Sequence, residues 1–168
     1  MNNSQLINQD SGNYEYYTPS SIIEAARATM GSIDLDPASS AKANQNVLAK
    51  HYFDKFGEHQ NWFGNVWLNH PFSRENNTVW IAKLVADYKQ YSIKQACCIT
   101  YASTSEKWFQ PMLSYTQCWL SPRTNYYLPD GTLKVGVTKG SVVTYLGPNK
   151  QAFYDNFKHL GKITIPYV

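Results

Sequence analysis

Residues 67–73 read Trp-Leu-Asn-His-Pro-Phe-Ser, and this stretch predicts the architecture of the whole chain. The apolar run that leads into it, residues 65–68, is typical of a buried parallel strand. The run stops at an amide, a proline and an aromatic ring. In parallel α/β sheets, a strand that stops in this way delivers side chains to a cleft at its carboxyl end. We therefore interpret residues 69–72 as an active-site loop.

The loop suits the alkylation of a flat, weakly nucleophilic amine such as that of adenine. The lone pair of this amine is delocalised into the ring, so acceptors for both of its hydrogens help to make the lone pair available. Asn69 supplies a side-chain oxygen, and the carbonyl of His70 supplies a second acceptor. Pro71 has a fixed φ that stiffens the turn. Phe72 offers a ring on which a base stacks, worth about 1–3 kcal/mol.

Three segments of the chain together resemble a known family. They are residues 16–19 (Tyr-Tyr-Thr-Pro), 33–39 (Ile-Asp-Leu-Asp-Pro-Ala-Ser) and 69–72 (Asn-His-Pro-Phe). The last resembles the (Asp/Asn/Ser)-Pro-Pro-(Tyr/Phe/Trp) loop of S-adenosylmethionine-dependent amino-methyltransferases. The order of the segments and much of their spacing, from residue 14 to residue 147, resemble the small phage and prophage DNA adenine-N6 methyltransferases, which are Dam-like. One departure is His70, which stands where the family has its first proline.

The resemblance implies S-adenosyl-L-methionine as the cofactor and assigns its binding to the first two segments. The implied contacts are Tyr17, Thr18, Pro19, Asp34, Asp36, Pro37, Ala38 and Ser39. A carboxylate and small residues after a strand suit the charged ammonium of the cofactor and a close approach of its chain to the backbone. From the residues alone, Thr18 and Pro19 equally suit a helix start, and Asp36 equally suits a cap.

The resemblance implies methylation of the N6 amine of adenine in DNA. An adenine that is single-stranded or flipped out of the duplex presents its amine in line with the sulfonium methyl group. N6-methyladenine and S-adenosylhomocysteine result, with no metal and no covalent enzyme intermediate. Two alternatives stay open. One is a catalytically silent methyltransferase fold that binds DNA or a host protein, as in phage counter-defence. The other is methylation of cytosine N4 or of glutamine.

Charge along the chain favours a nucleic-acid partner for its second part. Residues 1–60 hold four Lys/Arg against seven Asp/Glu, net −3, whereas residues 61–168 hold eleven against five, net +6. Cations interleaved with aromatics suit unpaired nucleotides. The expected DNA contacts are Ser73, Arg74, Arg123, Tyr126 and Lys139. Ordinary solvated lysines explain the same pattern. With little chain left for a recognition domain, loose specificity or a homodimer is expected.

Composition predicts a single domain at residues 14–168 that follows a flexible tail at residues 1–13. No apolar run approaches the ~20 residues of a membrane span, and the polar start is unlike a signal peptide. Three cysteines, two of them adjacent, make no disulfide framework, and the four histidines lack the spacing of metal ligands. The sequence therefore predicts a cytoplasmic protein without a metal site.

Alternating patterns predict an α/β fold, a trimmed Rossmann-like class I methyltransferase sheet with flanking helices. The expected strands are residues 32–35, 65–68, 95–101, 117–120, 141–146 and 163–168. The expected helices are residues 18–30 (capped by Thr18), 41–52, 76–91 (capped by Asn76 or Asn77) and 150–160, with a further helix start at 102–106 and a hairpin at 126–135. Residues 53–64 are then a loop, too short for two more strands. The acidic residue that ends a second strand and binds the cofactor ribose lacks a clear counterpart, and Asp54 and Glu58 are its candidates.

Overall fold

A seven-stranded sheet with helices on both faces forms the body of the protein in the computed structural model, which describes residues 16–167. The predicted tail, residues 1–13, lies outside the described residues. The helices are α2 (Ser20–Met30), α3 (Asn44–Val47), η1 (Gly57–His59), α4 (Arg74–Lys89), η2 (Gln110–Ser114) and α5 (Lys150–Phe157). The strands are β1 (Leu35–Asp36), β2 (His51–Tyr52), β3 (Asn65–Leu68), β4 (Gln95–Tyr101), β5 (Thr116–Leu120), β6 (Ser141–Leu146) and β7 (Gly161–Thr164).

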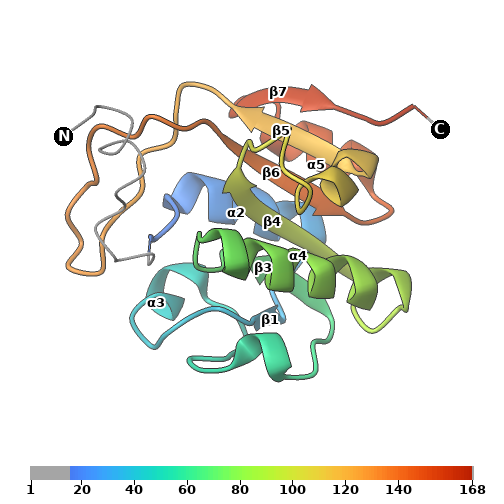
Figure 1. Cartoon of the computed structure of the whole chain (residues 1–168), viewed down its shortest axis with the longest axis horizontal. Coiled ribbons are helices and arrows are strands. Elements are labelled where there is room, and N and C mark those ends of the chain that lie inside the picture. The colour runs from blue at the N-terminus through green and yellow to red at the C-terminus, as the bar shows by residue number, and fades with distance from the viewer. Residues whose placement is uncertain (1–15, 168) are drawn as a thin grey trace.

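The sheet is parallel in one half and antiparallel in the other. Its strand order is β2-β1-β3-β4-β6-β5-β7. The first four strands run parallel, β6 is antiparallel to both β4 and β5, and β5 is antiparallel to β7. Figure 1 shows this sheet crossing the molecule. The predicted α/β class, compatible with a trimmed Rossmann-like methyltransferase sheet, is confirmed.

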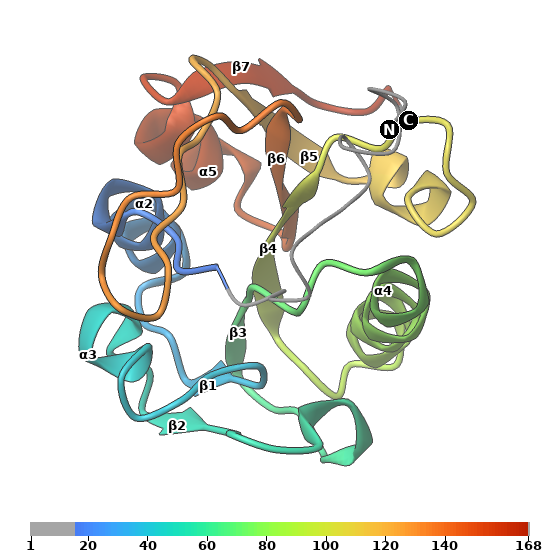
Figure 2. The ribbon, with the colours of Figure 1, turned by 60° about the vertical axis from the view of Figure 1, so that its left-hand side comes forward.

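Two apolar layers enclose the sheet because neighbouring residues of a strand point to opposite faces. Cys97 belongs to a cluster with Ile23 of α2 and Phe153 of α5. Its neighbour Cys98 belongs to the other cluster, with Leu84 of α4. Figure 2 shows the same division, with α2 and α5 on one side of the sheet and α4 on the other. The continuous apolar run of β4 therefore reflects burial on both faces.

The strand order reverses beside β1, and this reversal positions the site. From β1 the chain moves outward to β2 on one side, and then crosses to β3 on the other side of β1. Connections that leave neighbouring parallel strands in opposite directions open a crevice at the carboxyl ends of those strands, where ligands bind in open α/β sheets. The segments that follow β1, β2 and β3 are the ones that border this crevice.

The predicted helix at residues 41–52 is wrong. Only Asn44–Val47 is helical, and Leu48 adopts a left-handed conformation with φ 52°. The side chain of Asn44 accepts from the backbone N–H of Ala49 at 2.9 Å and donates to its carbonyl at 3.2 Å, which closes the turn early. The chain is thereby free to form β2, which pairs with β1. A second strand thus lies where the sequence indicated none.

Three local predictions also need correction. Thr18 does not cap α2, which begins after Pro19 without a side-chain cap. The cap of α4 is Ser73, whose hydroxyl accepts from the backbone N–H of Asn76 at 3.1 Å, so neither Asn76 nor Asn77 is the cap. Residues 102–106 begin no α-helix; turns there lead into the short 3-10 helix η2. Among residues 16–167, every helix is too short or too polar to span a bilayer.

Candidate active site

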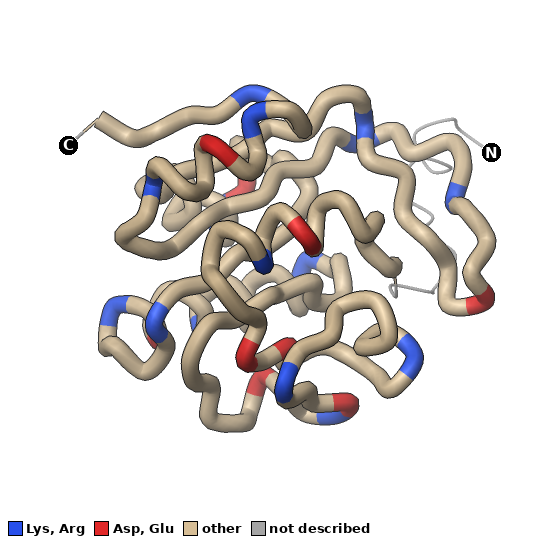
Figure 3. Tube along the Cα trace, turned by 180° about the vertical axis from the view of Figure 1, so that it is seen from behind, with Lys and Arg blue, Asp and Glu red and all other residues tan. Residues whose placement is uncertain are grey.

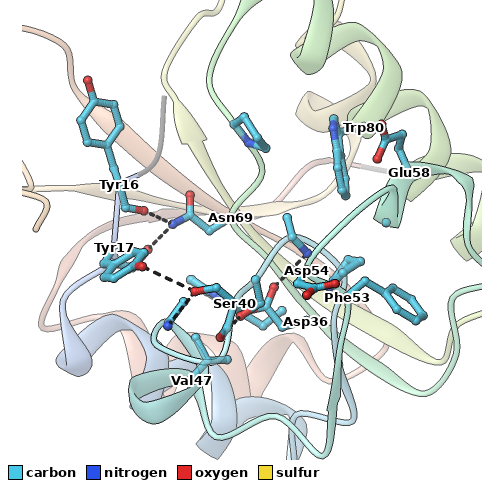
Figure 4. Close-up of a pocket in the computed structure, with 18 of the residues that line it drawn as sticks. Tyr16, Tyr17, Asp36, Ser40, Val47, Phe53, Asp54, Glu58, Asn69 and Trp80 are labelled. Atoms are coloured by element: carbon cyan, nitrogen blue, oxygen red, sulfur yellow. Dashed lines mark hydrogen bonds between the residues drawn. The ribbon is translucent and has the colours of Figure 1, made fainter. Parts of the chain in front are cut away.

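A cavity of about 240 Å³ occupies the crevice at the carboxyl ends of β1, β2 and β3. Its volume lies just below the range of ~300–1,000 Å³ that is usual for small-molecule sites. Figure 4 shows side chains from these separate segments turned toward one another around it. The predicted site residues that line the cavity are Tyr17, Thr18, Asp36, Pro37, Ala38, Ser39, Asn69 and Pro71. Three distant sequence segments thus meet at one place.

Asn69 lies at the rim of this cavity with its amide held in one orientation. Its Nδ2 donates to the carbonyl of Tyr16 at 2.6 Å and to Oγ1 of Thr18 at 3.1 Å (Figure 4). Within residues 16–167, no group donates to the Asn69 side-chain oxygen or to the His70 carbonyl. Both oxygens therefore retain lone pairs for the hydrogens of a ligand.

Phe72 does not offer the free ring face that the sequence suggested. Its side chain is 4% exposed and does not line the cavity. The ring packs 4.8 Å from that of Tyr101 and meets Tyr126 edge-on at 6.0 Å. Tyr16 lies against the same ring at 6.5 Å. In this structure, Phe72 fixes the loop from behind, through aromatic packing.

Asp36 is a carboxyl group buried in the cavity wall. It is 2% exposed, and its Oδ1 accepts from the backbone N–H of Ala38 at 3.2 Å. Burial raises the pKa of Asp36 from 3.8 to about 7, although hydrogen bonds from Ala38 and Ser39 oppose that rise. Within residues 16–167, no Lys or Arg forms an ion pair with it. A buried carboxylate of this kind suits a cationic ligand, which would supply the missing positive charge.

The segment after β2 supplies the wall that sequence reasoning left without an assignment. Asp54, two residues beyond the end of β2, lines the cavity together with Phe53 and Glu58 (Figure 4). Gly57 holds this wall against the turn after β1, because a Cβ there would overlap the carbonyl oxygen of Pro37. Within the described residues, no three His, Cys, Asp or Glu side chains are grouped to hold a metal ion.

Two residues implied as cofactor contacts do not line this cavity. Asp34 precedes β1, and its carboxylate joins Lys50 at 2.8 Å and the backbone N–H of Asn65 at 2.9 Å. It therefore connects the starts of neighbouring strands. Pro19 lines a different hollow, between the start of α2 and the segment after β5. Its carbonyl instead accepts from the first turn of α2. The Asp34 carboxylate therefore has a structural role, and the Pro19 carbonyl belongs to the start of α2.

A family model described as DNA N-6-adenine-methyltransferase (Dam) matches residues 5–130 of the 168-residue chain. The chain belongs to this family. The match contains every segment that lines the cavity, and it identifies the protein as a DNA adenine methyltransferase in general terms. No curated protein and no solved structure matches the chain.

His70 is the residue at which this Dam-family chain departs from the Pro-Pro loop that it otherwise resembles. The side chain is 1% exposed and stacks on Trp80 of α4 with ring centroids 6.1 Å apart. Its Nε2 lies 2.6 Å from Oδ1 of Asn77, on the same helix. In the family's loop, the proline at this position stiffens the loop through its ring. Here His70 fastens the loop to α4 instead. The loop is thereby held without that proline.

The buried imidazole makes a pH-dependent contribution to stability, and the expected pH range lies below neutrality. Burial lowers the pKa of His70 from 6.5 to about 4, and the Asn77 hydrogen bond only partly offsets this. Below pH 6.5 the imidazole of His70 therefore binds a proton in the unfolded chain. In the folded chain the same imidazole stays neutral until the pH falls to about 4. We expect the wild type to lose up to about 3 kcal/mol of stability as the pH falls through this range. His70→Phe, which keeps a flat ring over Trp80, should lose less, as thermal unfolding at pH 4.5 and 7.5 would show.

An equal acid-induced loss in the wild type and in His70→Phe would contradict this assignment. His159, an exposed histidine after α5, is the matched control, because its replacement by Phe should leave the difference between the two pH values unchanged. A pKa of about 4 leaves the His70 ring neutral at pH 7, so no pH response from this residue is expected near neutrality.

The expected DNA contacts are distributed unevenly around the site. Arg74 is exposed at the start of α4, directly after the loop, and Ser73 is engaged as the cap of that helix. Lys139 is exposed, with its Nζ 5.1 Å from the ring centroid of Tyr101. Arg123 is exposed on the segment that borders the second hollow. Figure 3 shows the Lys and Arg residues dispersed along the trace of the chain and not gathered at one place.

Tyr126 cannot contact DNA as the sequence suggested, because its side chain is 1% exposed. Its hydroxyl lies 2.6 Å from Oγ of Ser141, and its ring belongs to the aromatic group behind the loop. The neighbouring Tyr127, 41% exposed, is the ring that this segment presents. The predicted hairpin consists of isolated bridges, in which Tyr127 pairs with Leu133 and also with Tyr17. The segment is thereby tied to the cavity wall.

Proposed function

We propose that this protein transfers a methyl group from S-adenosyl-L-methionine to the N6 amine of adenine in DNA. The observation that carries the proposal is the Asn69 side-chain oxygen, which lies at the rim of a cavity at the switch point of the sheet and accepts no hydrogen bond from residues 16–167. The family match supports DNA and adenine as the substrate. The oxygens of Asn69 and His70 are suited to accept the two hydrogens of one amino group.

The residues of the cavity fit the proposed cofactor. When bound, S-adenosylmethionine supplies a methyl group activated by a positive sulfur. The buried carboxylate of Asp36 would hold its ammonium group, and the carboxylate of Asp54 would accept from its ribose hydroxyls. Ala38 and Ser39 keep the turn after β1 narrow, so that a ligand chain approaches the backbone. The role of the Gly-rich turn in most methyltransferases thus falls to small residues here.

The chain's own groups would orient the base and desolvate its amine. An adenine extruded from a duplex, at a cost of a few kcal/mol, would donate its two amino hydrogens to Asn69 and His70. These bonds favour the rehybridisation that gives the nitrogen a localised lone pair. They become stronger as positive charge develops on the nitrogen during transfer, so they stabilise the transition state more than the ground state. Arg74 and Lys139 would contact phosphates, as exposed cations near the loop.

Incubation of the protein with methyl-labelled S-adenosylmethionine and unmethylated DNA, followed by nucleoside analysis, tests the proposal. The label is expected in N6-methyladenine. Label in N4-methylcytosine would show that the target base is cytosine, with the same transfer of a methyl group to an exocyclic amine. Label in protein glutamine would remove DNA as the substrate. DNA binding without any transfer would leave a silent methyltransferase fold, and single-stranded and duplex DNA should be compared in the same series.

Asp54→Asn should weaken cofactor binding about tenfold, because a hydrogen bond to a charged group contributes roughly 1.5 kcal/mol. The side chain is exposed at the cavity, so the change should leave folding intact. Isothermal titration with S-adenosylmethionine measures the effect. Asp155→Asn on α5 makes the same chemical change far from the cavity and should leave the dissociation constant within about twofold. Equal affinities for Asp54→Asn and the wild type would remove Asp54 from the site.

A further inference from the structure

The amide of Asn69 is held by the chain that precedes α2, not by its own loop. Both hydrogens of Nδ2 have acceptors, the Tyr16 carbonyl at 2.6 Å and Thr18 Oγ1 at 3.1 Å. A carbonyl oxygen only accepts hydrogen bonds. If the amide turned over, its own oxygen would face the oxygen of Tyr16 at hydrogen-bond distance, with no hydrogen between them. The side chain therefore has one stable orientation, with Oδ1 directed away from Tyr16.

The two acceptors are themselves fixed in place. The backbone of Tyr17, between them, exchanges two hydrogen bonds with Tyr127, at 2.7 and 2.9 Å. The carbonyl of Thr18 accepts from Nδ2 of Asn46 at 3.0 Å, and Thr18 itself is 2% exposed. Residues 16–18 are thus tied to two separate parts of the chain, the segment before β6 and α3. This is the rigidity that a group must have to orient a catalytic amide.

We propose that residues 16–18 act as a positioning segment that makes the Asn69 side chain an obligate hydrogen-bond acceptor, with Thr18 as its positioning residue. The proposal rests on the proposed function, and it adds a rule for the target. The site receives a ring that donates through an exocyclic amino group, and it disfavours a ring that presents an oxo group at the same position. Two oxygens would then meet at Asn69, a repulsive contact that the fixed amide cannot relieve by turning over.

The same geometry predicts the effect of placing Asp at position 69, a residue that the loop motif of the wider amino-methyltransferases allows there. An ionised carboxylate has no hydrogen to give to the Tyr16 carbonyl, which lies only a hydrogen-bond length away. A protonated carboxyl group would restore the donor on that side and still leave an acceptor for the substrate. Asn69→Asp should therefore be active only in its protonated form.

Thr18→Val removes one acceptor and keeps the shape of the side chain, whereas Thr18→Ser keeps the acceptor. With saturating cofactor, we expect kcat of Thr18→Val to fall about 10- to 100-fold, since a small misplacement of a catalytic group costs up to ~100-fold. Thr18→Ser should stay within about threefold of the wild type. The resemblance implied Thr18 as a cofactor contact, but its Oγ1 is bound to Asn69, so the cofactor dissociation constant should change less than threefold in both variants. Equal damage in Val and Ser variants, or damage only to cofactor affinity, would overturn the proposal.

Asn69→Asp provides a second test that survives if Thr18→Val fails to fold. Its kcat should lie about 100-fold below that of the wild type at pH 8 and rise as the pH is lowered to 6, with saturating cofactor throughout. The wild type should show no such rise. A flat profile for Asn69→Asp, or activity equal to that of the wild type at pH 8, would show that the Tyr16 carbonyl does not constrain this side chain.

A readout without catalysis separates this proposal from the proposed function. In the ¹⁵N spectrum of the intact protein, the two side-chain amide hydrogens of Asn69, assigned by their loss in Asn69→Ala, should exchange slowly with solvent. Thr18→Val should speed the exchange of one of them at least fivefold, and Thr18→Ser should not. Unchanged exchange would refute the positioning role even in an active enzyme. Slow exchange in a protein that transfers no methyl group would refute only the proposed function.

Discussion

Asn69→Ala should lower the rate of methyl transfer to DNA by about 1,000-fold, the loss seen when a donor or acceptor at a reacting centre is removed. The variant loses a side-chain acceptor at the cavity rim that is bound to no other group within residues 16–167. The hydrogens of the base amine then meet no acceptor on that side. The two hydrogen bonds to Tyr16 and Thr18 that vanish with the amide contribute only about 1 kcal/mol each, so the variant should still fold. Labelled methyl transfer under saturating cofactor measures the change.

Asn76→Ala is the matched control for this prediction. Asn76 also lines the cavity. Its backbone N–H donates to the Ser73 hydroxyl, and this bond remains when the side-chain amide is removed. It should retain most of the activity. The two variants should bind S-adenosylmethionine equally well, since Asp36 and Asp54 remain. If Asn69→Ala kept more than a tenth of the wild-type rate, the loop would not be the place where the amine reacts.

The loop and its position were predictable because they depend on short, strong local signals. An apolar run that ends in Asn-His-Pro-Phe predicts a buried strand and a stiff turn whatever surrounds it, and both are present. The same holds for the carboxylate of Asp36 at the end of β1. These features need no knowledge of distant contacts. They decide that the residues after β1 and β3 lie at one edge of the sheet.

The second strand escaped prediction because its only support is tertiary. Residues 51 and 52 show no alternation of their own, and both are exposed. The strand exists because β1 offers a free edge and because Asn44 closes the preceding turn around Ala49. An Asn near the end of a short helical pattern was the available signal, since this residue favours turns. Recognising it would have placed Asp54 after a strand.

Exposure was the property that sequence could not assign to aromatic residues. Phe72 and Tyr126 carry the same types of ring as an exposed base-stacking platform, yet each is buried by the other and by Tyr16 and Tyr101. Four rings from separate segments converge only in the fold, and no single segment shows this. The orientation of the Asn69 amide depends on the backbone carbonyl of Tyr16. Every residue has such a carbonyl, so the residue types could not predict this contact.

Asp36→Asn should weaken the binding of S-adenosylmethionine roughly 100-fold at pH 8, because removal of one partner from a buried charge pair costs several kcal/mol. The ligand-free variant should nevertheless be more stable than the wild type. The folded pKa of Asp36, about 7, lies above the unfolded value of 3.8. Stability from this group is therefore full below pH 3.8 and is lost as the pH rises to 7, by up to about 4 kcal/mol.

Asp36→Asn is expected to lower the affinity for S-adenosylmethionine and to raise the stability of the ligand-free protein, and a purely structural residue would not combine these two effects. Ligand-free Asp36→Asn should melt above the wild type at pH 8 and alongside it at pH 3.5, whereas a residue that merely supports the fold would melt lower at both values. Wild-type affinity for the cationic ligand should rise as the pH increases through 7, and that of the variant should not. Asp34→Asn is the informative contrast, because Asp34 forms an ion pair with Lys50 outside the cavity. Asp34→Asn should lose stability and keep the wild-type affinity for S-adenosylmethionine. The reverse result would show that Asp34, and not Asp36, holds the cofactor.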